Sequence, residues 1–247
     1  IALDLSHSAS GVTLTQNDTI DNARIFGDVL FGAGNDQFNL LSGEVTGDVD
    51  FGGGSDTFNA TSAKLTGDAI FGGSSATVAL NSAVMEGALS LGAATGSLSF
   101  TNQSSYTGAI TRTGAGAMTL SVNNSTVNNT AAGTLNLTSM TLANNAKIGL
   151  VIDNARITGN TPIFNVSGTA DIGANTVLTP IFDQFTNQSF TLRLLNAGTL
   201  NLGGPLDAML TANSPYIYDI NLVQPNANAI DLTMDVKTAS ELGLNTR

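Results

Sequence analysis

The chain has 247 residues, 27 of them glycine, with no cysteine, 11% charged residues and a formal net charge of −11. The lack of cysteine excludes disulfides and cysteine metal sites. The acidic balance argues against nucleic acid or an anionic membrane as a partner, because both need a basic face. Abundant glycine with few charged helix formers favours an all-β chain, and the hydrophobic runs are too short for a transmembrane helix.

One phrase recurs every 20 residues in the first third of the chain, as Phe31-Gly-Ala-Gly-Asn-Asp-Gln-Phe38, Phe51-Gly-Gly-Gly-Ser-Asp-Thr-Phe58 and Phe71-Gly-Gly-Ser-Ser-Ala-Thr-Val78. A fixed period of this length predicts a solenoid, whose repeats bury their apolar faces against neighbours. Apolar residues alternate within each copy, and Gly, Asn, Asp and Ser break the runs. We therefore predict a right-handed parallel β-helix of about 20 residues per coil, with about three short strands in each coil.

The repeats align large apolar residues in columns. Two columns are Phe31, Phe51 and Phe71, and Phe38, Phe58, Val78, Leu98 and Met118. Because successive coils pair in parallel about 4.8 Å apart, each column is expected to form a ladder of like side chains in the interior. Each buried Phe would contribute about 1.5–3 kcal/mol. The five Phe residues are therefore predicted to be the structural ladder of the stem.

The glycine turns carry two aspartates, Asp36 and Asp56. Their Gly-x-Gly-x-Asp phrase resembles the nonapeptide of calcium-binding β-rolls, in which Asp supplies oxygen ligands. The third copy has Ala76 instead, and the other half of the coil does not repeat the phrase. We interpret both residues as turn carboxylates that satisfy backbone groups. We predict no metal and no cofactor, with calcium at Asp36 and Asp56 as the less favoured alternative.

Further acidic residues form the column Asp28, Asp48 and Asp68, one per coil. Stacked like charges repel, so these carboxylates are predicted to be solvated corners. Glu44 and Lys64 share another outward column and are expected to form a surface ion pair.

The sequence offers little for catalysis. His7 is the only histidine, and no nucleophile-elbow phrase accompanies it. Arg24, Arg112 and Arg156 invite comparison with polysaccharide lyases built on β-helices, yet the three fall in no common column. We predict no catalytic residue and no enzyme activity, and a carbohydrate-active enzyme is the least favoured alternative.

The pattern changes toward the C-terminus, where the apolar segments lengthen. Residues Tyr216–Leu222 and Ile230–Val236 alternate and are joined by a Pro/Asn linker, which predicts an antiparallel hairpin. A solenoid needs a terminal cap, since its last coil otherwise exposes an unpaired edge. The predicted cap residues are Tyr216, Tyr218, Ile230, Leu232 and Met234, with Asp231, Thr233 and Asp235 facing solvent.

The order of Gly133-Thr-Leu-Asn-Leu137, Phe190-Thr-Leu-Arg-Leu-Leu195, the hairpin and Lys237-Thr-Ala-Ser-Glu-Leu-Gly-Leu-Asn245 resembles the C-terminal end of an autotransporter (type V secretion) passenger. The resemblance implies a parallel β-helix stem over residues 1–145 and an autochaperone-like capping region over 146–236. It also implies that residues 237–247 start a linker helix to a membrane barrel. Both termini are expected to lie inside a longer polypeptide.

The same resemblance implies a function, namely a non-catalytic stem and folding module that supports secretion and surface display. Its partners would be the protein's own C-terminal membrane β-barrel and the outer-membrane assembly machinery. Its location would be the bacterial cell surface, anchored through that barrel, or the secreted fraction. The alternative is an adhesin, a virulence function, that binds ligands on host or neighbouring cells. Nucleic acid is not an expected partner.

Overall fold

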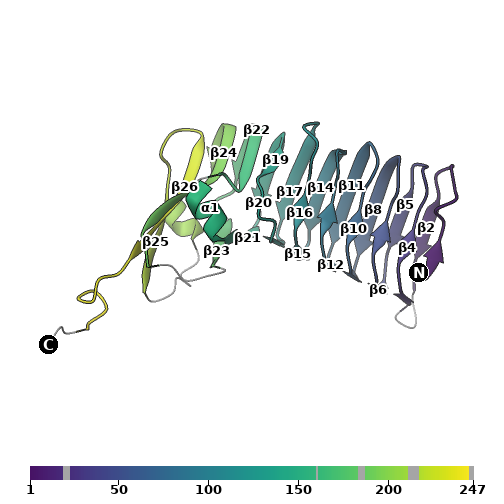
Figure 1. Ribbon diagram of the computed structural model, residues 1–247, viewed down its shortest axis with the longest axis horizontal. Helices are drawn as coiled ribbons and strands as arrows, with labels where there is room; N and C mark the ends of the chain where they lie inside the picture. Colours follow the sequence, from purple (N-terminus) through teal and green to yellow (C-terminus); the bar gives the residue numbers. More distant parts are fainter. Residues whose placement is uncertain (19–22, 160, 183–186, 211–216, 245–247) are drawn as a thin grey trace.

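The structure is a computed structural model that describes residues 1–18, 23–159, 161–182, 187–210 and 217–244. It is an all-β parallel solenoid of about 6 turns, with about 21 residues per turn. The coils stack along the long axis of the molecule, from the N-terminal coil to a C-terminal hairpin (Figure 1). The predicted fold class is therefore confirmed.

Three sheets run along the stack, each receiving a strand from successive coils. Sheet A contains β1 (Leu3–Asp4), β4 (Val29–Leu30), β7 (Val49–Asp50), β10 (Ala69–Ile70), β13 (Leu89–Ser90) and β16 (Ile110–Thr111). Sheet C contains β3 (Arg24–Phe26), β6 (Gly43–Thr46), β9 (Ala63–Thr66), β12 (Val84–Glu86), β15 (Ser105–Gly108), β18 (Thr126–Asn129), β21 (Lys147–Ile152) and β23 (Val177–Phe182).

Sheet B is the longest. Its parallel part contains β2 (Thr13–Gln16), β5 (Gln37–Leu40), β8 (Ser55–Thr61), β11 (Ser75–Asn81), β14 (Thr95–Thr101), β17 (Met118–Asn123), β20 (Ser139–Ala143), β22 (Phe164–Ile172) and β24 (Phe190–Leu202), with β19 (Leu135–Leu137) paired to β22. It ends in β26 (Ala229–Val236) and β25 (Tyr218–Val223), which are antiparallel. Alternate residues of these strands point into one continuous apolar core.

Glycine shapes one corner of the coil, between sheets C and A. Gly67 has φ +147°, and a Cβ there would lie 2.1 Å from the carbonyl oxygen of Gly47 in the preceding coil. Only glycine tolerates both the positive φ and this close backbone approach. The Thr-Gly-Asp phrase therefore marks where consecutive coils touch through bare backbone.

The register differs from the sequence prediction at one place. Leu98 pairs with Leu120, and Met118 lies opposite Gly96 rather than Leu98. Val84 pairs with Ser105 and Leu89 with Ile110, each 21 residues on, so one extra residue lies in the loop before β15 and a second in the loop before β17. Because a shift of two keeps each side chain on its original face, Met118 and Leu120 both stay buried.

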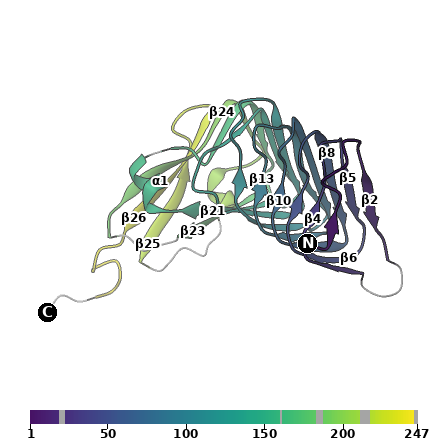
Figure 2. The ribbon, with the colours of Figure 1, turned by 45° about the vertical axis from the view of Figure 1, so that its right-hand side comes forward.

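The architecture changes after β16. Sheet A ends there, whereas sheets B and C continue, and the short helix α1 (Asn154–Gly159) follows β21. Figure 2 shows α1 beside the C-terminal strands, away from the regular coils. A 3₁₀-helix, η1 (Leu206–Met209), follows β24 and contributes the buried Met209. Since the parallel sheets pass residue 145 without a break, the division into stem and capping region stays a prediction.

Residues after β26 form a turn. Thr238 Oγ1 and Glu241 Oε2 make a capping box, with the Thr238 amide donating to Glu241 at 2.7 Å. These hydrogen bonds lower the pKa of Glu241. The linker helix predicted over 237–247 stays a prediction, and residues 245–247 lie outside the described part. Among the described residues, no helix combines the length and apolar character that a membrane crossing requires.

Candidate functional site

The aromatic ladder occupies the interior of the first coils. Phe51 lies between Phe31 and Phe71, with ring centroids 5.2 and 4.4 Å apart and nearly parallel planes. Phe38 and Phe58 form a second column, tilted against the first at 6.1–6.2 Å. All five rings are buried. The ladder is thus core, and it offers no aromatic side chain to a ligand.

The two aspartates of the glycine-rich phrase also point inward, Asp36 just before β5 and Asp56 within β8. Asp36 and Asp56 are each 1% exposed. Asp56 Oδ1 accepts the amide N–H of Asp36 at 2.9 Å, and Asp36 Oδ1 accepts that of Val12 at 2.7 Å. The second oxygen of each carboxylate has no hydrogen-bond partner. Burial, together with the charge of Asp36, raises the pKa of Asp56 to about 6, despite the opposing hydrogen bond.

This arrangement does not fit a calcium centre. Calcium takes six to eight oxygen ligands, and the column continues from Asp56 to Ala76 and Gly96, which supply no side-chain oxygen. Within the described ranges, no group of three or more His, Cys, Asp or Glu side chains lies close enough to hold a metal. Asp36 and Asp56 instead act as acceptors for the backbone of the preceding coil.

The second aspartate column is an ordered ladder at a corner. Asp28 Oδ1 accepts the amide of Asp48, Asp48 Oδ1 accepts that of Asp68, and Asp68 Oδ1 accepts that of Ala88, at 2.7–3.0 Å. Asp48 is exposed, and its two neighbours are partly exposed. Each carboxylate therefore stays hydrated while it bonds the next coil, which offsets the repulsion between like charges.

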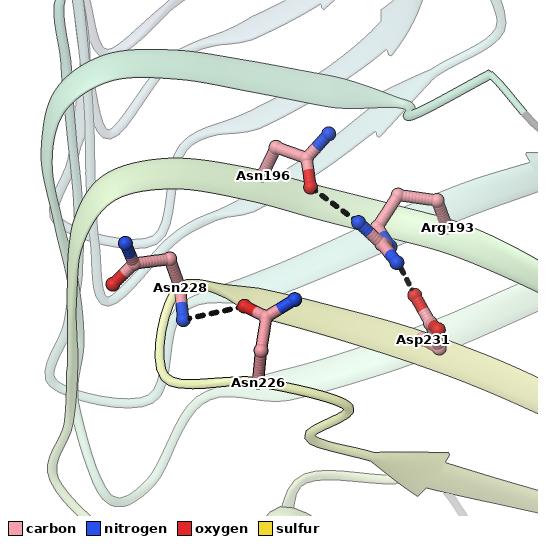
Figure 3. A network of polar contacts seen from close by, with 5 residues as sticks. All are labelled: Arg193, Asn196, Asn226, Asn228 and Asp231. Atoms are coloured by element: carbon pink, nitrogen blue, oxygen red, sulfur yellow. Dashed lines mark hydrogen bonds and ion pairs between the residues drawn. The ribbon is translucent and has the colours of Figure 1, made fainter.

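The seam between the stack and the hairpin contains a charged network that the sequence analysis missed. The Arg193 guanidinium on β24 pairs with the Asp231 carboxylate on β26, and its Nη1 donates to Asn196 Oδ1 at 2.6 Å (Figure 3). At the hairpin loop, the Asn228 amide donates to Asn226 Oδ1 at 2.9 Å. The sequence does contain a signal for this pair: a single Arg within an otherwise apolar strand, and an Asp in the apolar strand that pairs with it.

The prediction that Asp231 faces solvent on β26 is wrong. Asp231 is 7% exposed rather than solvent-facing. β26 lies between β24 and β25, and β24 has an irregularity between Arg193 and Leu195. Arg193 therefore covers the outer face of β26 at this point. Asp235 is exposed and Thr233 is partly exposed.

The other cap residues face the core. Ile230, Leu232 and Met234 are buried, as is Tyr218, whose ring lies 5.9 Å from that of Phe182 at the end of sheet C. Tyr216 lies outside the described residues. The hairpin thus extends sheet B with an apolar face directed at the last coil.

Arg112, which is partly exposed, and Arg156, which is buried, both donate hydrogen bonds to backbone carbonyl groups. Arg112 donates to the carbonyl oxygens of Ala94, Gly116 and Asn136, near the end of sheet A. Arg156, which is 1% exposed in α1, donates to Ala131 and Gly133. Burial lowers the pKa of both guanidinium groups. Both residues fasten loops where the regular coil is interrupted, and they lie in separate places.

Arg24 and His7 lie on the surface. Arg24 pairs with Glu44 at 3.8 Å, while Lys64 pairs with Glu86 at 2.9 Å, so the predicted Glu44–Lys64 pair is replaced by these two. Near the N-terminus, Ser6 Oγ donates to Asp4 Oδ1 at 2.6 Å and lies 3.5 Å from His7 Nδ1. The hydrogen bonds from Ser6 lower the pKa of Asp4. Because the hydroxyl is directed at the carboxylate, His7 does not activate it as a general base.

One face of the stack carries no charge. In β2, β5, β8, β11, β14, β17 and β20, all of them fully described, every outward-facing residue is Ser, Thr, Asn, Gln or Ala. Asparagine ladders cross the coils here, for example from Asn59 Nδ2 to Asn39 Oδ1 at 3.0 Å. We call this surface the Ser/Thr/Asn face. The ion pairs and the Asp28 column lie elsewhere on the coil.

Comparison of the chain with family models, curated proteins and solved structures finds no match in any of the three.

Proposed function

We propose that the chain is a non-catalytic stem with a folding module at its C-terminal end, from the surface-exposed passenger of a bacterial autotransporter. The observation that carries this proposal is the closure of the stack. Sheet B continues from the parallel coils into the antiparallel hairpin, with Arg193 and Asp231 paired at the junction. The resemblance described above supports the assignment to type V secretion.

The closure gives a physical basis for an autochaperone role. In a solenoid each coil is stabilised mainly by its neighbours, so folding starts in the strongest part and spreads by stacking. In the hairpin, β25 pairs with β26 over separations from 8 residues at Val223–Asp231 to 18 at Tyr218–Val236, against 20 between coils such as β8 and β11, and shorter-range pairs form faster. A preformed β25–β26 hairpin would then offer the edge of β26 to β24, and the added β24 would present an ordered edge for β22.

The test compares two truncations of the purified chain. Removal of residues 218–247 deletes the hairpin, and removal of residues 1–23 deletes N-terminal chain as a control. After dilution from denaturant, we expect the hairpin deletion to refold slowly and to stay protease-sensitive, and the control to refold like the whole chain. Addition of a peptide covering residues 187–247 should restore part of the rate. Equal refolding of the two truncations would refute the folding role.

The Ser/Thr/Asn face favours adhesion as the second candidate. A rigid, neutral array of hydroxyl and amide groups suits a neutral polar ligand, such as a polysaccharide, better than a charged one. Replacement of Thr57 and Thr119 by Lys would place charges on this face, while Thr46→Lys on sheet C is the matched control. Adhesion predicts that only the first variant loses binding to fixed cells and to neutral polysaccharides. Equal binding by all forms would contradict it.

A further inference from the structure

The most unusual group in the regular coils is the buried carboxylate pair. Asp36 and Asp56 are both buried, yet neither forms an ion pair with any cation in the described part of the chain. Each has one oxygen bonded to an amide of the preceding coil, and one oxygen that is buried without a partner. An ionised carboxylate with an unsatisfied buried oxygen is costly, and a second carboxylate one coil away adds repulsion.

The surroundings of Asp56 supply no compensating charge. The coil on its N-terminal side presents Asp36, and the coil on its C-terminal side presents Ala76. The next inward-facing residue along β8 is Phe58, which belongs to the Phe ladder. Among the described residues, Asp36 is the charged group that acts on Asp56. The least costly form of the pair therefore carries a proton.

We propose that Asp36 and Asp56 form a proton-operated switch in the first coils, which pack tightly when Asp56 holds a proton beside Asp36 and loosen when Asp56 is ionised. The switch is local, since the same column continues as Ala76 and Gly96. Protonation therefore changes the packing of the first coils, while the packing of the coils beyond β14 does not depend on it.

The direction of the pH effect follows from linkage. The pKa of Asp56 is about 6 in the folded chain, against 3.8 for a free Asp. Between these values the folded state holds a proton that the unfolded chain releases, so stability falls as pH rises from about 4 to about 6. The difference between these two pKa values is about 2, which corresponds to about a 100-fold change in the opening equilibrium, because each step of one in pKa is a factor of ten.

The experiment measures hydrogen exchange of single amides in the whole chain between pH 4 and pH 7, corrected for the intrinsic exchange rate. We expect the amides of Phe38 and Phe58 to lose protection about 10- to 100-fold as pH rises. Amides of β20 in the same sample should change much less and serve as the internal reference. Asp56→Asn should remove the pH dependence, because the amide oxygen still accepts the Asp36 N–H and carries no charge.

The matched control is Asp48→Asn, which alters a carboxylate with a similar inter-coil hydrogen bond at an exposed position. It should keep the wild-type pH dependence. Loss of the dependence in this control, or its persistence in Asp56→Asn, would overturn the proposal. If Asp56→Asn fails to fold, carboxyl NMR of the wild-type chain decides: titration of Asp56 near 6 supports the switch, and titration near 4 refutes it.

Calcium provides a separate outcome. The exchange series is run once with EDTA and once with millimolar CaCl₂ at pH 7. The proton switch predicts equal protection in both. Restoration of protection by calcium in the wild type, but not in Asp56→Asn, would show a cation site and would overturn the proton proposal.

Discussion

Truncation of the central ring of the aromatic ladder tests the interior directly. Phe51 is 0% exposed, and its two ring faces are covered by Phe31 and Phe71 at 5.2 and 4.4 Å. A buried Phe→Ala change costs about 3–5 kcal/mol, because it loses transfer free energy and leaves a cavity. We expect Phe51→Ala to fall at the upper end of this range, since two ring contacts are lost together.

The matched control is Phe26→Ala, which removes the same ring from a side chain that is 67% exposed. It should change stability by about 0.5 kcal/mol or less. Urea unfolding followed by circular dichroism gives the global effect, and hydrogen exchange at Val49 and Ala69 gives the local one. Equal effects of the two substitutions would refute the assignment of Phe51 to the core.

Three further predictions concern backbone contacts and the seam. Arg193→Met should destabilise the hairpin by about 3–5 kcal/mol, because it leaves Asp231 buried and unpaired. In urea unfolding, the double variant with Asp231→Leu should recover most of this lost stability. An absence of recovery would contradict the pairing. Arg156→Met should raise protease cleavage in the loop that contains Gly133, since two backbone carbonyl groups lose their hydrogen-bond donor. An unchanged cleavage pattern would show that the guanidinium does not stabilise this loop. Gly47→Ala should lower the melting temperature by several degrees, because its Cβ would lie 2.4 Å from the backbone of the preceding coil. Gly133→Ala is the control and should leave the melting temperature unchanged, because a Cβ there would meet no described atom within 4 Å. Similar melting temperatures for the two variants would contradict this account.

The repeats could be predicted from sequence because the period and the alternation agree. A 20-residue spacing places Phe31, Phe51 and Phe71 in one column, and their apolar character fixes which face is buried. The prediction is wrong at Met118, where one extra residue in each of two loops shifts the register by two without changing the face. Only three-dimensional pairing shows how an insertion is divided between loop and strand.

The seam shows a second limit of sequence reasoning. Alternation assigns Asp231 to the solvent side, but the irregularity in β24 and the position of β26 between two strands bury it against Arg193. The sequence predicts Asp36 and Asp56 to be turn carboxylates that satisfy backbone groups; each accepts a backbone amide, but Asp56 lies within β8 and not in a turn. Their depth in the core could not be derived, because glycine-rich turns do not reveal which side of the chain their polar groups occupy.

The reversal of strand direction at β26 also affects how such a protein can change in length. A duplicated coil inserted among the parallel strands would meet the same ladders above and below, since each coil contacts chiefly its two neighbours. The antiparallel hairpin offers no such equivalent position, because a parallel coil inserted between β24 and β26 would meet β26 running in the opposite direction. Gene duplication can therefore lengthen the regular coils in whole units while the closing hairpin is inherited unchanged.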